Sequence, residues 1–287
     1  MKIVSIINPK GGAGKTVSSL NIAYALKNRN KKVLLIDTDP RGAIATYLAI
    51  ENENTILEAI IENYQNFGML DISKYVKEKN GVDIIVANSN LIEIDEFFRK
   101  EGDIQGQLNS FKELSEHFHQ YDYIVVDTEG TINNMIRSIL NTTDYIFAPT
   151  KVSYIDTTGL RDLLKMVNIG KRNNPKISLE EVFCVQVKEN TKVFKKAHEE
   201  LKNELKKICG NCYSDIYIRE DANILNSMEE NKDIFSYKKS SNAAIDYKNL
   251  VSFSPLRYWG SLYLFKSPMF DNYIVLVPFD IGVVYIR

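Results

Sequence analysis

The stretch that decides the fold is residues 2–16, which read KIVSIINPKGGAGKT. An apolar run of strand length leads directly into a glycine-rich turn, and the residues after the turn have helical spacing. Backbone N–H groups of such a turn can close around phosphate oxygens, and the positive end of the following helix attracts the same charge. The stretch therefore predicts a strand–loop–helix unit that binds a phosphate group.

The loop itself supplies the candidate nucleotide-binding residues, which are Gly11, Gly12, Ala13, Gly14, Lys15, Thr16 and Val17. In the general loop G-x-x-x-x-G-K-[ST], the lysine reaches the β- and γ-phosphates and the hydroxyl ligates Mg²⁺. Lys15 and Thr16 hold those two positions. Pro9 stands where the general pattern has its first glycine, whereas the variant KGGxGKT is met in full. A glycine-rich turn without a ligand is the alternative.

Short apolar runs alternate with segments of helical spacing along most of the chain. We expect strands at residues 2–7, 32–36, 82–87, 123–126, 145–148, 182–187 and 213–218. We expect helices at residues 16–30, 55–66, 94–118, 133–140, 157–172 and 191–208. Apolar strands flanked by helices indicate an α/β fold, with a doubly wound, mostly parallel sheet and helices on both faces. Ligands of such sheets bind at the carboxyl ends of the strands.

Two further strand ends bear carboxylates. Residues 33–42 read VLLIDTDPRG, and residues 121–130 read YDYIVVDTEG. Asp37, Asp39 and Asp127 are therefore expected at the edge of the sheet where the phosphate loop lies. Phosphoryl transfer depends on positioning and charge neutralisation rather than on a covalent nucleophile, and these residue types suit it. A helix cap or a closed turn is the alternative for the first two carboxylates.

Composition places the chain among ordinary globular proteins. Its 287 residues include 36 Lys and Arg against 37 Asp and Glu, for a formal net charge of -1, and 44% are hydrophobic. These values exclude a disordered chain, and three cysteines are too few for a disulfide scaffold. Without a visible signal segment or membrane-length apolar run, we expect free cysteines, a cytoplasmic location and no membrane partner. A local basic face stays compatible with near-neutral net charge.

The three motifs together resemble those of the ParA/MinD group of deviant Walker-A ATPases, and within it the ParA-type partition proteins. The resemblance implies that ATP and Mg²⁺ are the ligands. It implies that Lys15 acts on its own nucleotide, while Lys10 reaches across a dimer interface to the partner's nucleotide, the role of an arginine finger elsewhere. It also implies that Asp39 orients the attacking water, and that Mg²⁺ is held by Thr16, Asp37 and Asp127.

The resemblance spans about residues 1–252 and departs from the family pattern at several positions. Arg41 stands where the family has Gln. Val17 stands where the family often has a second Thr on the α-phosphate, and Ser18 comes one position late. Glu129 belongs to a segment that differs from the family's DxPP. It could act near the γ-phosphate or lie in a solvated loop, and we favour the solvated loop.

Residues 253–287 have a different character and form an aromatic, β-like C-terminal tail of unknown role. Period-two patches predict strands at 273–277 and 283–286, separated by Pro268 and Pro278. We therefore divide the chain into a P-loop ATPase domain, residues 1–252, and this tail.

By the resemblance, the function is ATP hydrolysis by a homodimer that forms on ATP binding and holds DNA without sequence preference. A centromere-binding, ParB-like adaptor stimulates hydrolysis, and the protein associates with the nucleoid when ATP is bound, in plasmid or chromosome partition. The helix expected at 191–208 presents lysines opposite its apolar stripe, and the candidates for DNA contact are Lys192, Lys195 and Lys196. A solvated helix face is the alternative for these lysines.

Two other functions stay open. Cys209 and Cys212 form a CxxC pair, and a dimer of such pairs could supply the four thiolates of an iron–sulfur cluster. That possibility describes a nucleotide-gated scaffold or iron–sulfur carrier. A MinD-like membrane-positioning ATPase is the other alternative, although the tail lacks the basic amphipathic helix that holds such relatives on membranes. Cys184 lies in an apolar run and is expected to be buried.

Overall fold

A seven-stranded sheet forms the centre of the fold. The computed structural model describes residues 1–151, 157–209, 212–253, 263–266, 273–276 and 283–286. The sheet has the strand order β3-β4-β2-β5-β1-β6-β7. Its strands are β1 (Lys2–Ile6), β2 (Val33–Thr38), β3 (Lys77–Lys79), β4 (Val82–Ile85), β5 (Tyr123–Thr128), β6 (Tyr145–Lys151) and β7 (Ser178–Val185). Neighbouring strands are parallel except β3 and β4, which pair antiparallel at one edge.

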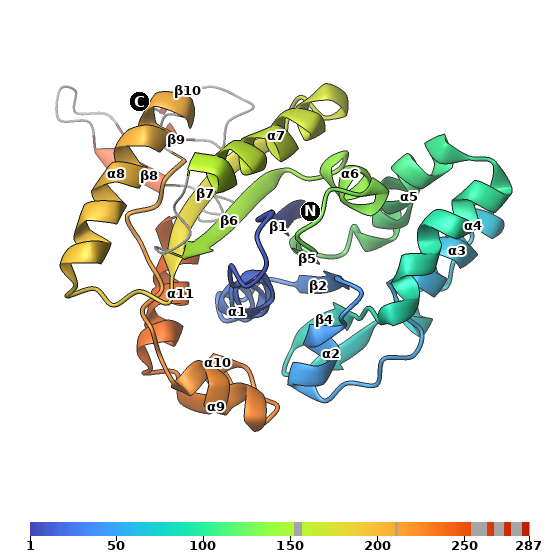
Figure 1. Ribbon diagram of the computed structural model, residues 1–287, viewed down its shortest axis with the longest axis horizontal. Helices are drawn as coiled ribbons and strands as arrows, with labels where there is room; N and C mark the ends of the chain where they lie inside the picture. Colours follow the sequence, from blue (N-terminus) through green and yellow to red (C-terminus); the bar gives the residue numbers. More distant parts are fainter. Residues whose placement is uncertain (152–156, 210–211, 254–262, 267–272, 277–282, 287) are drawn as a thin grey trace.

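Helices cover both faces of this sheet (Figure 1), which confirms the expected doubly wound α/β fold. On one face a shared apolar cluster joins the sheet to α1 (Lys15–Lys27), α2 (Ala43–Leu48), α10 (Ile234–Lys238) and α11 (Asn242–Phe253). Two further clusters involve α3 (Ile56–Gln65), α4 (Ile94–Glu101), α5 (Ile104–Ser115), α6 (Asn134–Leu140), α7 (Thr157–Asn173) and α8 (Lys192–Cys209). β2 and β5 are buried at every position because helices cover both of their sides.

Shorter helical segments complete the fold. They are α9 (Asn223–Glu229), which contacts α10, and three 3₁₀ turns, η1 (Ile72–Lys74), η2 (Ser89–Glu93) and η3 (Glu116–Phe118). Within the described parts of the chain, none of the helices combines the length and the apolar character that crossing a membrane requires.

Two of the expected elements are wrong. The segment 94–118 is not one helix, because Gly102 takes a left-handed conformation (φ 69°) and ends α4. The Asp103 side chain then starts α5 by accepting a hydrogen bond from Gly106 N at 2.6 Å. The segment 213–218 forms no strand: Tyr213 makes an isolated bridge to Val182 of β7, and Arg219, just after the segment, makes another to Val187. β3, α2, α9, α10 and α11 were not expected, and all of them except α11 are short.

The C-terminal tail contains a separate three-stranded antiparallel sheet. Its strands are β8 (Tyr263–Lys266), β9 (Tyr273–Leu276) and β10 (Val283–Ile286), in the order β10-β9-β8. β9 and β10 correspond to the two strands expected at 273–277 and 283–286. Pro268 and Pro278, the expected separators, lie outside the described residues.

Candidate nucleotide-binding site

The loop between β1 and α1 has the backbone conformation of an anion site. Gly12 (φ 70°) and Gly14 (φ 87°) are left-handed, and an added Cβ at Gly14 would lie 3.1 Å from Val185 Cγ2. Gly11 and Gly12 are exposed, whereas Ala13 is buried. Among the described residues no side chain caps the N-terminus of α1, and its first turn has no acidic residue. Its N–H groups and the positive helix end therefore face the loop.

The loop is anchored to β6, and it holds its lysine inside. Asn8 accepts a hydrogen bond from Lys10 N at 2.8 Å and donates one to Pro149 O at 2.7 Å. Lys15 is only 6% exposed, and its Nζ donates to Lys10 O at 3.2 Å. Burial lowers the pKa of Lys15, and the Asp127 carboxylate opposes that effect. The Lys15 ammonium thus lies where the motif predicts it, next to buried negative charge.

Asp37 and Asp127 occur near the ends of neighbouring strands. They are direct partners in the β2–β5 register, and both are completely buried. Burial raises the pKa of Asp127 to about 6, against hydrogen bonds from the Thr16 and Ser19 hydroxyls. Burial, together with the neighbouring Asp127, raises the pKa of Asp37 well above its usual range. A nearby cation would relieve the repulsion between two such carboxylates.

The residues at this edge fit a magnesium ion. Asp127 Oδ1 accepts a hydrogen bond from Ser19 Oγ at 2.9 Å, whereas its buried Oδ2 has no partner among the residues that the structure describes. Both oxygens of Asp37 accept from backbone N–H groups, Oδ1 from Asp39 at 2.9 Å. Mg²⁺ prefers one or two carboxylates plus phosphate oxygens and water. The Thr16 hydroxyl and Asp127 Oδ2 suit direct ligands, and Asp37 suits the supporting position.

Arg41 pairs with the carboxylate that, by resemblance, orients the attacking water. Asp39 is 6% exposed, and its Oδ1 accepts from Arg41 N at 3.0 Å and from Arg41 Nε at 3.1 Å. The hydrogen bond to Asp39 raises the pKa of Arg41. The Arg41 side chain is 72% exposed. The sequence shows that Arg replaces Gln at position 41. It does not show that the Arg41 side chain contacts Asp39, because residues two apart need not meet.

The Lys10 and Ser18 side chains each meet a helix from a later part of the chain. An added Cβ at Gly159, in α7, would lie 3.3 Å from Lys10 Nζ, so the Lys10 side chain lies against that helix. Ser18 is completely buried, and its Oγ is 3.1 Å from Tyr247 Oη in α11. It therefore does not replace the hydroxyl that the family places on the α-phosphate. Val17 is half-buried at that position.

Glu129 is half-buried, not solvated. It is on the wall of a cavity of about 240 Å³ that also touches Pro40, after β2, and Asp95, in α4. Its carboxylate accepts a hydrogen bond from Asn133 Nδ2. Burial and the nearby Asp39 raise the pKa of Glu129. The negative charge of Glu129 therefore adds to that of the aspartates at this edge of the sheet.

The lysines considered for DNA contact are on α8. The apolar stripe of α8 is confirmed, since Phe194 and its helical neighbours pack into the core. Lys192, Lys195 and Lys196 are exposed on the opposite face. Lys196 lies 3.8 Å from Glu200 on the same helix, which reduces its charge toward an external phosphate.

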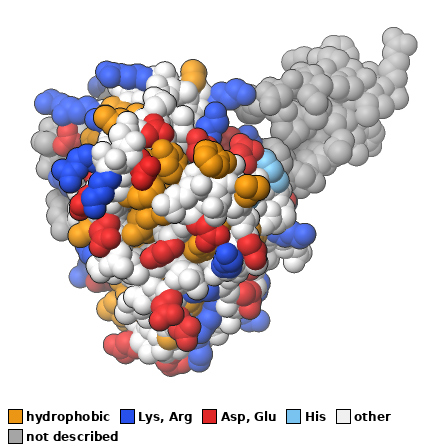
Figure 2. All heavy atoms as spheres, turned by 90° about the vertical axis from the view of Figure 1, so that its right-hand side faces the viewer, with side chains coloured by type: hydrophobic (Ala, Val, Ile, Leu, Met, Phe, Trp, Pro, Cys, Tyr) orange, Lys and Arg blue, Asp and Glu red, His pale blue; other side chains and the backbone are white. Residues whose placement is uncertain are grey.

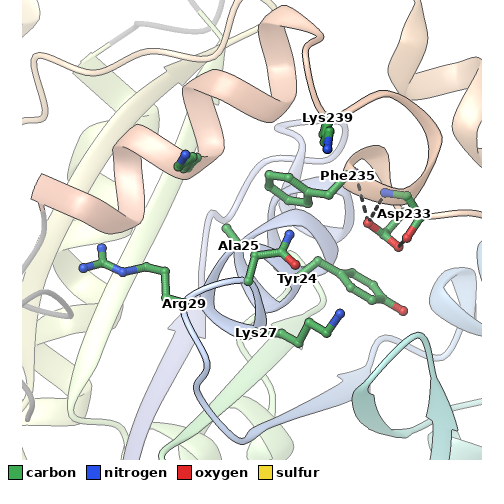
Figure 3. Close-up of a pocket in the computed structure, with 10 residues that line it drawn as sticks. Tyr24, Ala25, Lys27, Arg29, Asp233, Phe235 and Lys239 are labelled. Carbon is green, nitrogen blue, oxygen red and sulfur yellow. Dashed lines mark hydrogen bonds between the residues drawn. The ribbon is translucent and has the colours of Figure 1, made fainter.

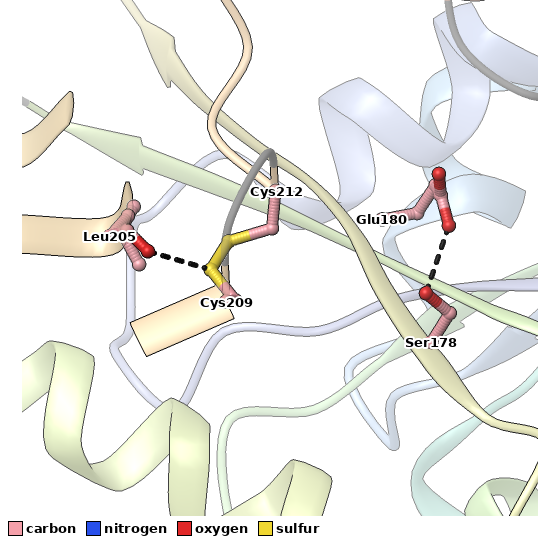
Figure 4. The surroundings of a disulfide bond; sticks show 5 residues. All are labelled: Ser178, Glu180, Leu205, Cys209 and Cys212. Atoms are coloured by element: carbon pink, nitrogen blue, oxygen red, sulfur yellow. Dashed lines mark hydrogen bonds between the residues drawn. A yellow bond between two sulfur atoms is a disulfide. The ribbon is translucent and has the colours of Figure 1, made fainter. Parts of the chain in front are cut away.

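The CxxC pair at the end of α8 is oxidised. Cys209 and Cys212 form a disulfide (Figure 4), so the expectation of free cysteines is wrong for this pair. Cys184 is a buried free thiol, as expected. A disulfide offers no thiolates to an iron–sulfur cluster. Among the described residues, moreover, His, Cys, Asp and Glu side chains nowhere gather in threes as a metal centre.

The fold and this site define a P-loop nucleotide-binding protein with a deviant Walker-A loop. A family model described as an AAA domain matches residues 1–179, and the chain belongs to that family. Within it, the chain is a ParA-type partition ATPase homologue, as the relatives below and the three motifs agree.

Two curated relatives and one solved structure illustrate the similarity. The sporulation initiation inhibitor protein Soj of Bacillus subtilis is 28% identical over 209 residues, which cover 70% of this chain and 79% of that protein. The chromosome partitioning protein ParA of Myxococcus xanthus is 24% identical over 211 residues, 72% of each chain. Cobyrinic acid a,c-diamide synthase from Mycobacterium smegmatis, solved with an ATP analog and magnesium, has a TM-score of 0.72 at 16% identity, covering 91% of this chain and 96% of that one. At that identity the likeness shows the fold alone.

Proposed function

We propose that this protein is a Mg²⁺-dependent ATP hydrolase that dimerises on ATP and then binds DNA without sequence preference, to drive plasmid or chromosome partition. The observation that carries the proposal is the meeting of buried Lys15, the Asp37–Asp127 pair and the uncapped end of α1 at one edge of the sheet. The partition role is supported by the similarity to a chromosome partitioning protein.

The proposed hydrolysis begins with the polyphosphate against α1. Loop N–H groups and Lys15 donate hydrogen bonds to the phosphate oxygens. Thr16 and Asp127 would hold Mg²⁺, which neutralises charge on the phosphates when it is bound. Asp39 accepts a hydrogen bond from the attacking water and orients it toward the γ-phosphorus. The bond from that phosphorus to ADP breaks as the bond to water forms, which yields ADP and phosphate.

Lys10 completes the site of the partner protomer in this proposal. Its ammonium lies against Gly159 in α7. Arg41 is engaged by Asp39, and Lys15 is the cation that its own protomer places on the phosphates. In this proposal Lys10 of the partner adds a second cation for the transition-state charge. We also propose that a centromere-binding, ParB-like adaptor accelerates hydrolysis in the cytoplasm, where the ATP-bound dimer is held on the nucleoid.

The basic test is phosphate release by purified protein with ATP and Mg²⁺. Lys15→Ala is expected to abolish turnover, and Asp39→Ala is expected to abolish hydrolysis while ATP binding persists. Either variant turning over at the wild-type rate would sink the proposed mechanism. DNA binding is measured with ATP, ADP and no nucleotide at two salt concentrations. Equal DNA affinity with ATP, with ADP and without nucleotide would exclude a dimer that binds DNA only in its ATP-bound form.

A mixing experiment tests the trans role of Lys10. Lys10→Ala and Asp39→Ala proteins are each inactive alone under the proposal. A mixed dimer has one complete site, because one protomer supplies Asp39 and the other supplies Lys10. An equal mixture should therefore recover about a quarter of the wild-type rate, since half of the dimers are mixed. No recovery, with dimerisation verified, would place Lys10 in its own site.

A further inference from the structure

A basic cavity lies at the end of α1 opposite the nucleotide loop (Figure 3). It has a volume of about 330 Å³, and its walls come from the C-terminal end of α1, from α10 and from α11. The 13 residues of α1 place this cavity about 20 Å from the loop, at 1.5 Å per residue. Its lining includes two aromatic rings and four cationic side chains, which are Tyr24, Phe235, Lys27, Arg29, Lys239 and Lys248.

The acidic residue in this lining does not neutralise the cations. Asp233 is 1% exposed and forms the N-cap of α10. Its Oδ1 accepts from Phe235 N and Ser236 N, each at 2.9 Å. Its Oδ2 accepts from Ser236 Oγ at 2.5 Å and from Asn80 Nδ2 at 3.2 Å. Both oxygens are therefore occupied by neutral donors, and four cations against this one carboxylate leave the cavity with a net positive charge.

The cations are placed to face a ligand. Arg29 is held in position by hydrogen bonds from its Nη1 to Val251 O at 2.9 Å and to Ser252 Oγ at 3.2 Å. Lys239 and Lys248 are exposed, and neither forms an ion pair with any described residue. The carbonyl end of α1 contributes partial negative charge, which Lys27 in the last turn offsets. Figure 3 shows the Phe235 ring between Lys239 and the end of α1.

Some lysines elsewhere on the surface are already paired. On and beside α8, Lys202 lies 2.5 Å from Asp215 and Lys196 lies 3.8 Å from Glu200. On the face formed by α3, α4 and α5, acidic and basic side chains are interspersed (Figure 2). Phosphate contacts need cations that are not already paired, since an internal carboxylate competes for them. Lys239 and Lys248 meet this condition, and so do Lys192 and Lys195 on α8; the cavity in addition gathers four cations and an aromatic ring around one hollow.

We propose that the cavity between α1, α10 and α11 is the main contact of this chain with the backbone phosphates of double-stranded DNA. The inference rests on the proposed function, in which each protomer of the ATP-bound dimer offers one such cavity to DNA. Ammonium groups on α10 and α11 bind the phosphodiester oxygens, and the Phe235 ring is a flat apolar wall for the sugar. Readout of this kind is independent of sequence, because it touches only the backbone.

The test compares two pairs of exposed lysines in the full-length protein. Lys239→Gln/Lys248→Gln removes charge from the cavity, and Lys192→Gln/Lys195→Gln removes the same charge from α8. Binding of a short mixed-sequence duplex is measured by fluorescence anisotropy with ATP and Mg²⁺ over a range of salt. The cavity variant should lose at least about tenfold in affinity, and its salt slope should fall by about 2 per cavity, since it removes two phosphate contacts from each. The α8 variant should lose less than about threefold.

Each outcome has a defined reading. Equal losses in both variants, or a larger loss from α8, would overturn the inference. If the wild-type protein does not bind the duplex with ATP, the proposed function itself is contradicted. If binding depends on ATP but the cavity variant has the same duplex affinity as the wild type, only the inference is contradicted. Inorganic phosphate is added in a separate arm against chloride of equal ionic strength. If phosphate stabilises the wild type but not the cavity variant, and duplex affinity is the same in both, the cavity binds free phosphate and the DNA assignment is wrong. Basal ATP hydrolysis without DNA should be unchanged in both variants, which verifies folding.

Discussion

Replacing Arg41 with Gln should raise the basal rate of ATP hydrolysis. Asp39 Oδ1 accepts two hydrogen bonds from Arg41, one from its backbone N–H at 3.0 Å and one from Nε at 3.1 Å. The substitution keeps the first and removes the second, together with the positive charge. A carboxylate that no longer faces a guanidinium is a stronger acceptor for the water that Asp39 is proposed to orient.

The size of the effect follows from the exposure of Arg41. Its side chain is 72% exposed, so solvent screens the ion pair. Exposed pairs of this kind contribute about 0.2–1 kcal/mol, which corresponds to roughly a 1.4- to 5-fold change in rate. The KM for ATP should change little, because the pair involves the water-orienting residue and not the phosphate cradle.

The assay is phosphate release at saturating ATP and Mg²⁺ without DNA or adaptor. Arg41→Lys serves as the matched control, because it keeps the charge but loses the Nε–H that contacts Asp39, and it should lie between wild type and Arg41→Gln. A rate that falls tenfold or more in Arg41→Gln would refute the reasoning and assign the guanidinium to the polyphosphate. An unchanged rate would show that the pair does not restrain Asp39.

Three further predictions concern stability and affinity. Gly68→Ala should lower the free energy of unfolding in urea by about 1–2 kcal/mol, because the left-handed backbone (φ 83°) strains an alanine although its Cβ would meet no other atom. Gly42→Ala (φ 58°) should lower it further, because there the added Cβ would also lie 2.5 Å from a carbonyl oxygen. Equal losses in the two variants would contradict this. Burial raises the pKa of Glu181 from 4.5 to about 7, so the folded state binds an extra proton and stability should fall as pH rises between those values. Glu181→Gln should flatten that slope, and an unchanged slope would exclude Glu181 as its source. Tyr247→Phe should cost about 1 kcal/mol of unfolding free energy by removing the partner of Ser18, with ATP affinity unchanged; weaker ATP binding would give Ser18 a role at the nucleotide.

Much of the fold and the nucleotide loop could be predicted because their signals are local. Apolar runs mark β1, β2 and β5, and glycines mark the turn before α1. The two wrong elements have different causes. The break at Gly102 is a single left-handed residue inside a pattern that otherwise looks helical. The segment 213–218 has the composition of a strand, yet it makes only an isolated bridge, because pairing depends on its position relative to β7 and not on its own residues.

The sequence by itself determined the class of site, since backbone conformation at a glycine-rich turn and the order of strand and helix depend on neighbouring residues. Only the tertiary structure decided which side chains meet. It pairs Arg41 with Asp39, buries Ser18 against Tyr247, and leaves one oxygen of Asp127 without a partner among the described residues. It also brings the end of α1 together with α10 and α11, more than 200 residues later, to form a basic cavity. Side-chain charge becomes a binding surface only when folding removes nearby counter-charges, and no pattern along the chain records that.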